Sequence, residues 1–110
     1  MKTKLMKADT EMPPCMLFPK TLTDIPVSNT AKVIYCLILD ALILKGQKDE
    51  SGILYVSFPI TVIAEIISRS PMTVRRSLSE LETAGLIKRE RQGIGKVNRI
   101  YVSIPGKEEM

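Results

Sequence analysis

The sequence predicts an α+β fold in which three helices pack with a small antiparallel sheet in one domain. Three segments carry apolar residues at helical spacing next to helix-capping residues; they span residues 29–45, 60–67 and 71–84. Three other segments are rich in β-branched and aromatic residues, as strands are; they span residues 53–58, 86–91 and 99–104. With 110 residues, the chain has room for one domain with one modest core.

The first helix is predicted over residues 29–45. Ser28 precedes it as an N-cap, because a serine hydroxyl can accept a hydrogen bond from a free amide of the first helical turn. Gly46 follows it, at the place where a terminating glycine is expected. Apolar side chains surround almost the whole helix, so we expect it either to occupy the centre of the core or to be covered partly by a second subunit.

The second and third helices follow each other closely. Pro59 suits the start of the helix at residues 60–67, where a missing amide costs little. Ser70 and Pro71 supply an N-cap and a first-turn proline for the third helix, which ends before Gly85. Inward-facing residues recur at helical spacing in both helices: Ile60, Ile63 and Ile67 in one, and Val74, Leu78 and Leu81 in the other.

The last two strands form a hairpin around a glycine-rich turn, Gly93–Lys96. Residues Ile100, Val102 and Ile104 alternate toward one face of its return strand. The order of elements is helix, strand, helix, helix, strand, strand, which is the order of the winged helix-turn-helix fold, with the basic β-hairpin as its wing. The predicted boundaries are a flexible tail, the winged-helix domain and a second flexible tail, at residues 1–14, 15–105 and 106–110.

Basic residues concentrate in the second half of the chain, although the whole chain carries a net charge of only +4. Residues 68–99 contain eight basic and three acidic residues, a net charge of +5. Residues 21–67 contain three basic and five acidic residues, a net charge of −2. Such an asymmetry predicts a polyanionic partner for the basic half. The alternative is a solvated basic surface without a ligand.

The helix pair and the hairpin predict double-stranded DNA as that partner. In a helix-turn-helix the second helix enters the major groove, led by its N-terminal residues. Arginine can read guanine there, threonine and methionine methyl groups can contact thymine, and a helix N-terminus can hold a phosphate. The candidate contacts are Ser70, Met72, Thr73, Arg75, Arg76 and Ser79 on the helix, and Arg89, Arg91, Lys96 and Arg99 on the hairpin. We expect Arg75 to read one base and Lys96 to contact phosphate at any sequence.

Other interpretations of the same residues stay open at this point. Arg76 has Glu80 one helical turn away and could simply pair with it. A charged hairpin could serve only solubility. A winged-helix domain could also act as a transcriptional regulator, or as a protein-interaction module that binds no DNA.

Residues 84–102, AGLIKRERQGIGKVNRIYV, resemble the wing of the plasmid replication initiator A family, in its N-terminal domain. That family has a leucine-isoleucine strand there, followed by basic residues, Q-G-x-G-K and N-R-I-Y-V. Residues 18–20, 28–35 and 52–55 resemble the family's P-K, L-S-x-x-A-K-x-x-Y and G-x-x-Y segments. The resemblance therefore covers residues 18–102, which is most of the chain.

The resemblance implies a winged-helix domain that binds repeats at a plasmid replication origin, usually as a dimer. The DNA contacts that it implies are Thr73, Arg75, Arg76, Arg91, Lys96 and Asn98. Val97 departs from the pattern, because the family usually has proline there. Initiators also carry a further C-terminal domain, whereas this chain ends at Met110. We therefore expect either an excised domain or a protein that binds DNA without loading a replisome.

A homodimer is also predicted from the residues themselves. One apolar side of the first helix and an N-terminal arm are expected to remain uncovered by the core. The candidate dimer contacts are Leu17, Phe18, Cys36, Leu39 and Ile43. Cys36 is further expected to be a buried reduced thiol, and not half of a disulfide with Cys15, because free cysteine usually behaves as a small apolar residue.

The sequence argues against catalysis. It contains no histidine, the commonest general base and metal ligand, and no cysteine spacing that could hold zinc. Gly93–Lys96 is no phosphate-binding loop of the P-loop type, because Glu90 and Val97 replace the glycine and the serine or threonine that this motif needs. We therefore expect no catalytic residue, metal, cofactor or small-molecule substrate. Without an apolar signal segment or a run of about 20 apolar residues, we also expect no membrane partner and a cytoplasmic location.

Overall fold

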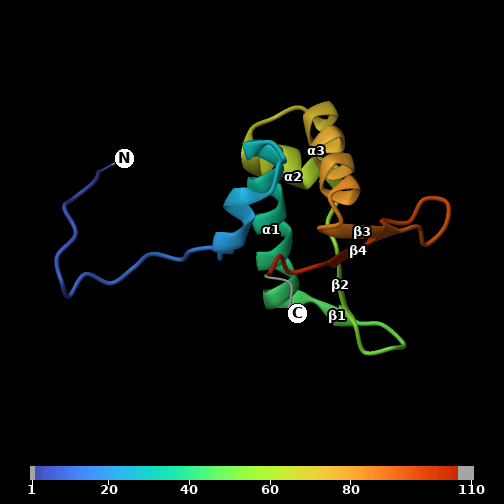
Figure 1. Cartoon of the computed structure of the whole chain (residues 1–110), viewed down its shortest axis with the longest axis horizontal. Coiled ribbons are helices and arrows are strands. Elements are labelled where there is room, and N and C mark those ends of the chain that lie inside the picture. The colour runs from blue at the N-terminus through green and yellow to red at the C-terminus, as the bar shows by residue number, and fades with distance from the viewer. Residues whose placement is uncertain (1, 107–110) are drawn as a thin grey trace.

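Three helices and a four-stranded antiparallel sheet form the fold in the computed structural model, which describes residues 2–106 (Figure 1). The predicted α+β winged-helix fold is confirmed. After a short 3-10 helix at Lys20–Asp24, the elements are α1 (Asn29–Lys45), β1 (Gln47–Lys48), β2 (Leu54–Ser57), α2 (Ile60–Ile67), α3 (Pro71–Thr83), β3 (Ile87–Glu90) and β4 (Arg99–Val102). The order of the strands in the sheet is β1-β2-β4-β3.

The helix boundaries follow from the capping residues. Ser28 Oγ accepts a hydrogen bond from the Ala31 amide at 3.1 Å. Ser70 Oγ accepts a hydrogen bond from the Thr73 amide at 3.2 Å. These hydroxyls satisfy amides that have no partner within the first helical turn. α1 and α2 have the predicted bounds, and α3 ends at Thr83, one residue before the predicted end.

Two glycines follow helices for different reasons. Gly85 comes after α3 with a φ of 77°, a left-handed conformation that favours glycine. The sequence suggests the same role for Gly46, but its φ is −64° and its backbone is extended. A Cβ atom at this position would collide with the carbonyl oxygen of Leu42. Close approach to the backbone of the last turn of α1, and not a left-handed turn, therefore favours glycine at this position.

The strands are shorter than predicted, and one of them is not predicted at all. β1 consists of Gln47 and Lys48, which pair with β2. Two polar residues carry no alternating pattern, so this strand is defined only by its hydrogen-bonding partner. β4 ends at Val102, and Ile104, which was expected to face the core, is exposed. The Ser103 amide continues the pairing beyond β4, by donating to the carbonyl oxygen of Leu86 at 2.9 Å.

Strand pairing assigns each residue of the sheet to one of its two faces. Ile100 lies opposite Arg89 on β3 and Val56 on β2, so these three side chains share a face. This face packs against the helices, because Val56 and Ile100 are both buried in the core. The neighbours of Ile100 in β4, Arg99 and Tyr101, point to the opposite face.

α1 runs through the centre of the core, as its apolar pattern allows (Figure 1). Its buried residues are Ala31, Ile34, Tyr35, Cys36, Ile38, Leu39, Ala41 and Leu42. Because the side chains of Cys36 and Leu39 are only 3% and 5% exposed, they cannot offer an open surface to a second subunit. This part of the predicted dimer surface is wrong, since the chain's own core covers that side of α1. Leu17, Phe18 and Ile43 are exposed, and the dimer that they would form stays a prediction.

The N-terminal segment lies outside the packed core. Residues 2–19 contain no helix or strand and extend away from the side of the molecule that carries the β3–β4 hairpin (Figure 1). Cys15 in this segment is free and exposed, whereas Cys36 is free and buried, as expected. Residues 1 and 107–110 of the predicted tails lie outside the described residues, and the flexibility of both tails stays a prediction.

A buried hydroxyl group ties α1 to the end of the sheet. Tyr35 is completely buried, and its hydroxyl donates a hydrogen bond to the carbonyl oxygen of Ser103 at 2.7 Å. Burial, with a further contribution from the neighbouring Cys36, raises the pKa of Tyr35 to about 12. The neutral phenol is therefore the form that the folded protein requires.

Replacing Tyr35 with phenylalanine is expected to lower the free energy of unfolding by about 1–3 kcal/mol, because the Ser103 carbonyl loses its donor. The stabilisation of the neutral phenol is complete below the ordinary tyrosine pKa of 10.0 and is lost as the pH rises towards 12, so the variant should also lose this alkaline dependence. Urea unfolding over this pH range measures both effects. Tyr55→Phe is the control, because the Tyr55 hydroxyl bonds the exposed Gln47 side chain and no other group within residues 2–106. Equal losses in the two variants would contradict the assignment.

Candidate nucleic-acid interface

A short turn sets the angle between α2 and α3. Ser68 ends α2 in the left-handed conformation, with a φ of 55° and a ψ of 47°. The amide of Arg69 then donates back to the last turn of α2, to the carbonyl oxygen of Ala64 at 3.1 Å. Because Ser70 caps α3 directly afterwards, the two helices form a helix-turn-helix with the first turn of α3 at the surface.

α3 presents different residues to the core, to solvent and to the hairpin. Its buried residues are Val74, Ser77, Leu78 and Leu81. Met72, Arg76 and Ser79, spaced i, i+4 and i+7, share an exposed face on the opposite side. Arg75 is turned by about 100° from Arg76, because successive helical residues are separated by that angle. It lines a groove that is bounded by α2, α3 and the β3–β4 hairpin.

Glu80 does not pair with Arg76, as one interpretation of the sequence allowed. Its two carboxylate oxygens accept hydrogen bonds from the amide and the hydroxyl of Ser28, each at 2.7 Å. The N-cap of α1 therefore occupies this carboxylate and joins α1 to α3. Within residues 2–106, neither Arg75 nor Arg76 forms an ion pair. Both guanidinium groups remain available to a ligand.

The β3–β4 hairpin projects beside α3 and forms the wing (Figure 1). Its tip contains Gly93 and Gly95, whose φ values of 129° and 77° favour glycine. Arg91 and Lys96 flank the tip and are exposed. Ile94 lies between the two glycines and is completely exposed. The wing therefore adds two exposed cations and a narrow tip to the surface next to α3.

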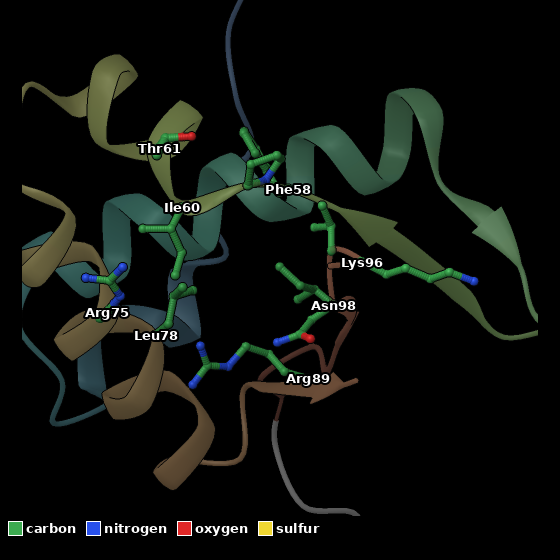
Figure 2. A pocket seen from close by; sticks show the side chains of 11 residues that line it. Phe58, Ile60, Thr61, Arg75, Leu78, Arg89, Lys96 and Asn98 are labelled. Carbon is green, nitrogen blue, oxygen red and sulfur yellow. The ribbon is translucent and has the colours of Figure 1, made fainter. Parts of the chain in front are cut away.

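A groove of about 330 Å³ separates α3 from the wing (Figure 2). Its apolar lining includes Phe58, Ile60, Leu78, Val97 and Ile100. Its polar lining consists of Thr61 from α2, Arg75 from α3, and Arg89, Lys96 and Asn98 from the hairpin. Among residues 2–106, no acidic residue lines it. The Lys96 side chain extends away from the groove, while Arg89 reaches towards α3 (Figure 2).

Comparison with known families identifies the chain. The family model of the replication initiator protein A (RepA) N-terminus matches residues 12–107. The chain belongs to this family. The resemblance seen in the wing residues is thereby confirmed. A comparison with curated proteins finds no match.

Solved structures share the fold of this initiator domain at low sequence identity. A structure described as a Rep–DNA complex has a TM-score of 0.72 and 24% identity, over 87% of this chain and 79% of that chain. An MDR initiator has a TM-score of 0.70 and 22% identity, over 87% and 81%. The N-terminal domain of a DNA-binding protein has a TM-score of 0.67 and 20% identity, over 98% and 88%.

In this initiator domain Arg89 is paired within the chain. Its Nε and Nη2 atoms donate to Glu82 Oε1 at 3.0 and 2.7 Å, and its backbone amide donates to Glu82 Oε2 at 3.3 Å. These bonds join the last turn of α3 to the first strand of the wing. Arg89 is therefore not the unpaired cation that the sequence suggested, because the Glu82 carboxylate already balances its charge.

Arg99 points away from the surface of α3 and the wing. Its guanidinium lies 4.3 Å from the centre of the Tyr55 ring, and its Nη1 atom lies 3.8 Å from the Glu50 carboxylate. The strand alternation that directs Ile100 into the core directs Arg99 to the outer face of the sheet. The expected contribution of Arg99 to the basic wing surface is therefore not observed. The sequence pattern could have predicted this, because residues that alternate with Ile100 and Val102 in a strand point to the opposite face.

The remaining predicted contacts lie on α3 or on the wing; they are Ser70, Met72, Thr73, Arg75, Arg76, Ser79, Arg91, Lys96 and Asn98. Phe58, just before α2, and Thr61, in its first turn, also line the groove, and the sequence did not predict either of them. No local pattern marks them, because only the packing of α2 beside the wing brings them to this surface. The pairing of Glu82 with Arg89 was not predicted either, because it joins two different elements.

Within residues 2–106, no three histidine, cysteine, aspartate or glutamate side chains come together as a possible metal site. No helix in that part is both long enough and apolar enough to span a membrane.

Replacing Glu82 with glutamine is expected to weaken the acid sensitivity of the fold. Hydrogen bonds from Arg89 lower the pKa of Glu82, against the opposing effect of desolvation. Ionised Glu82 therefore stabilises the fold above the ordinary pKa of 4.5, and this contribution is lost as the pH falls through the lowered pKa. Urea unfolding on acidification should show a shallower loss of stability in the variant. Glu65→Gln, at an exposed site on α2, should keep the wild-type slope, and an unchanged slope for Glu82→Gln would refute the role of the pair.

Proposed function

We propose that this chain binds double-stranded DNA in a sequence-specific way, at repeats of a plasmid or mobile-element replication origin. α3 would lie in the major groove, and the wing would contact the neighbouring part of the duplex. The observation that carries the proposal is the joint surface of α3 and the wing. It combines Arg75 and Arg76 on α3, neither of which forms an ion pair within residues 2–106, with the exposed Arg91 and Lys96 on the wing.

The comparisons support this proposal in two ways. Membership of the replication initiator family points to replication as the process. One protein with the same fold is described as a Rep–DNA complex, and another as a domain of a DNA-binding protein. Glu80 could have neutralised Arg76, but its carboxylate is bound to Ser28 instead. The Arg76 guanidinium therefore remains available to DNA.

Selection of genomic fragments by the purified chain, at two salt concentrations, tests the proposal. We expect enrichment of fragments with repeated sites, and a steep loss of affinity at the higher salt because phosphate contacts release counterions. Enrichment of promoters without repeats would favour a transcriptional regulator. Failure to enrich any duplex at either salt would refute DNA binding and favour a protein-interaction module.

We further propose that the chain acts as a cytoplasmic homodimer and has no catalytic activity. Exposed Leu17, Phe18 and Ile43 support an interface between two copies, because they lie outside the chain's own core. A dimer would place two α3 helices about one DNA turn apart, which suits repeated half-sites. Sedimentation tests this part, and a monomer at high protein concentration would refute it. The absence of histidine from the sequence supports a binding role without catalysis.

A further inference from the structure

We propose that Arg75 and Arg76 have different roles on DNA: Arg76 reads a base, and Arg75 holds the sugar-phosphate strand that runs through the groove between α3 and the wing. The inference rests on the proposed function and divides its main contacts. It also reverses the role of Arg75, which the sequence alone suggested as the reader of a base.

Arg75 and Arg76 lie on different sides of α3. Arg76 lies on the exposed face with Met72 and Ser79, directly opposite the side that packs into the core. This is the face that a recognition helix turns to the floor of the major groove. Arg75 lies instead with Leu78 on the side that lines the groove, which Arg76 does not reach. The structure thus separates two adjacent arginines that look equivalent in the sequence.

The groove lies where a DNA strand would pass between α3 and the wing. If α3 lies in the major groove and the wing contacts the adjoining minor groove, one sugar-phosphate strand separates the two contacts. That strand must pass between α3 and the wing, where the structure has its groove (Figure 2). In this docking geometry the groove therefore holds a sugar-phosphate strand.

The charge of the groove suits a sugar-phosphate strand. Its lining cations are Arg75, Arg89 and Lys96, and no acidic residue in the described part of the chain lines it. Arg89 is balanced by Glu82, so it fixes the wall of the groove without attracting an anion strongly. Arg75 has no ion-pair partner within residues 2–106 and is the cation that α3 itself supplies to this wall. Thr61 and Asn98 add uncharged hydrogen-bonding groups for the same strand.

The test compares alanine and lysine variants of the two arginines in the full chain. Lysine keeps the positive charge and can still bind a phosphate, but it lacks the planar fork with which arginine binds guanine. Binding is measured to the preferred site, to all its single-base substitutions, and over a range of salt. Thermal unfolding of each variant checks that these exposed positions leave the fold intact.

For Arg75 we expect alanine to weaken binding to every site equally. It should also reduce the magnitude of the salt slope, that is, of log affinity against log salt concentration, by about 1. Arg75→Lys should restore both properties. For Arg76 we expect either substitution to weaken the preferred site by about 5- to 100-fold and to abolish discrimination at one base pair. Arg76→Lys should keep the wild-type salt slope while it loses that discrimination.

Two results would overturn the division. One is loss of discrimination at a base pair in Arg75→Lys, and the other is an unchanged sequence preference in Arg76→Lys. A different result would refute the recognition-helix proposal itself, namely wild-type binding by both alanine variants. If the wild-type chain selects no duplex, the proposed function and this inference are refuted together.

Discussion

Leu78→Ala should lower the free energy of unfolding by about 2–5 kcal/mol, because it removes a buried side chain and leaves a cavity. Leu78 is 1% exposed and lies in the core stripe of α3 with Val74 and Leu81. A domain of this kind is stabilised by about 5–15 kcal/mol in total, so the loss is a large share. The same side chain also lines the groove between α3 and the wing. Unfolding in urea, followed by circular dichroism, measures the change.

Met72→Ala is the matched control for this prediction. Met72 lies on the same helix but is 55% exposed, so its removal should change stability by only about 0.5 kcal/mol. The two variants together test which face of α3 packs inward. Equal losses would show that the helix is rotated relative to the core described above.

Removing Arg91 and Lys96 together by alanine substitution should flatten the salt dependence of DNA binding. Each phosphate contact contributes about 0.9 to the magnitude of the negative slope of log affinity against log salt. Loss of two contacts should therefore reduce that magnitude by about 2. Both side chains are exposed and flank the glycine tip of the wing. We expect the affinity to fall for all sequences alike, because phosphate contacts carry no base information. Titrations at several salt concentrations measure the slope.

A second double variant, with alanine at Lys20 and Lys48, controls for net charge. It removes the same two positive charges, but from exposed positions outside α3 and the wing. We expect it to keep the wild-type slope. If both double variants lower the slope equally, the chain binds DNA through its overall charge and not through the wing.

Much of the helical part of this fold was predictable because its signals are local. Ser28 and Ser70 act as N-caps at the expected positions, and the spacing of Val74, Leu78 and Leu81 identifies the buried side of α3. These features depend on residues within one or two helical turns. The same reasoning failed for β1, whose two polar residues become a strand only by pairing with β2.

The candidate site was predictable in composition but not in arrangement. The charge asymmetry and the glycine-rich hairpin placed the DNA contacts on α3 and the wing. Arg89 and Arg99 were included because they are basic, yet Glu82 balances one and the Tyr55 ring covers the other. Such pairings join residues from different elements, so no count of charges along the chain reveals them.

For this protein, local order along the chain was thus sufficient for the fold class, the helix limits and the family. Helix periodicity, capping and the wing residues act over short distances, and each can be recognised without knowledge of the remaining structure. Which residues remain exposed and unpaired for a ligand was decided only by the three-dimensional packing. Burial of Cys36 and Leu39, the hydrogen bonds between Glu80 and Ser28 and the position of Arg75 along the groove all depend on contacts between distant segments. Those contacts exist only after the helices and the sheet have come together.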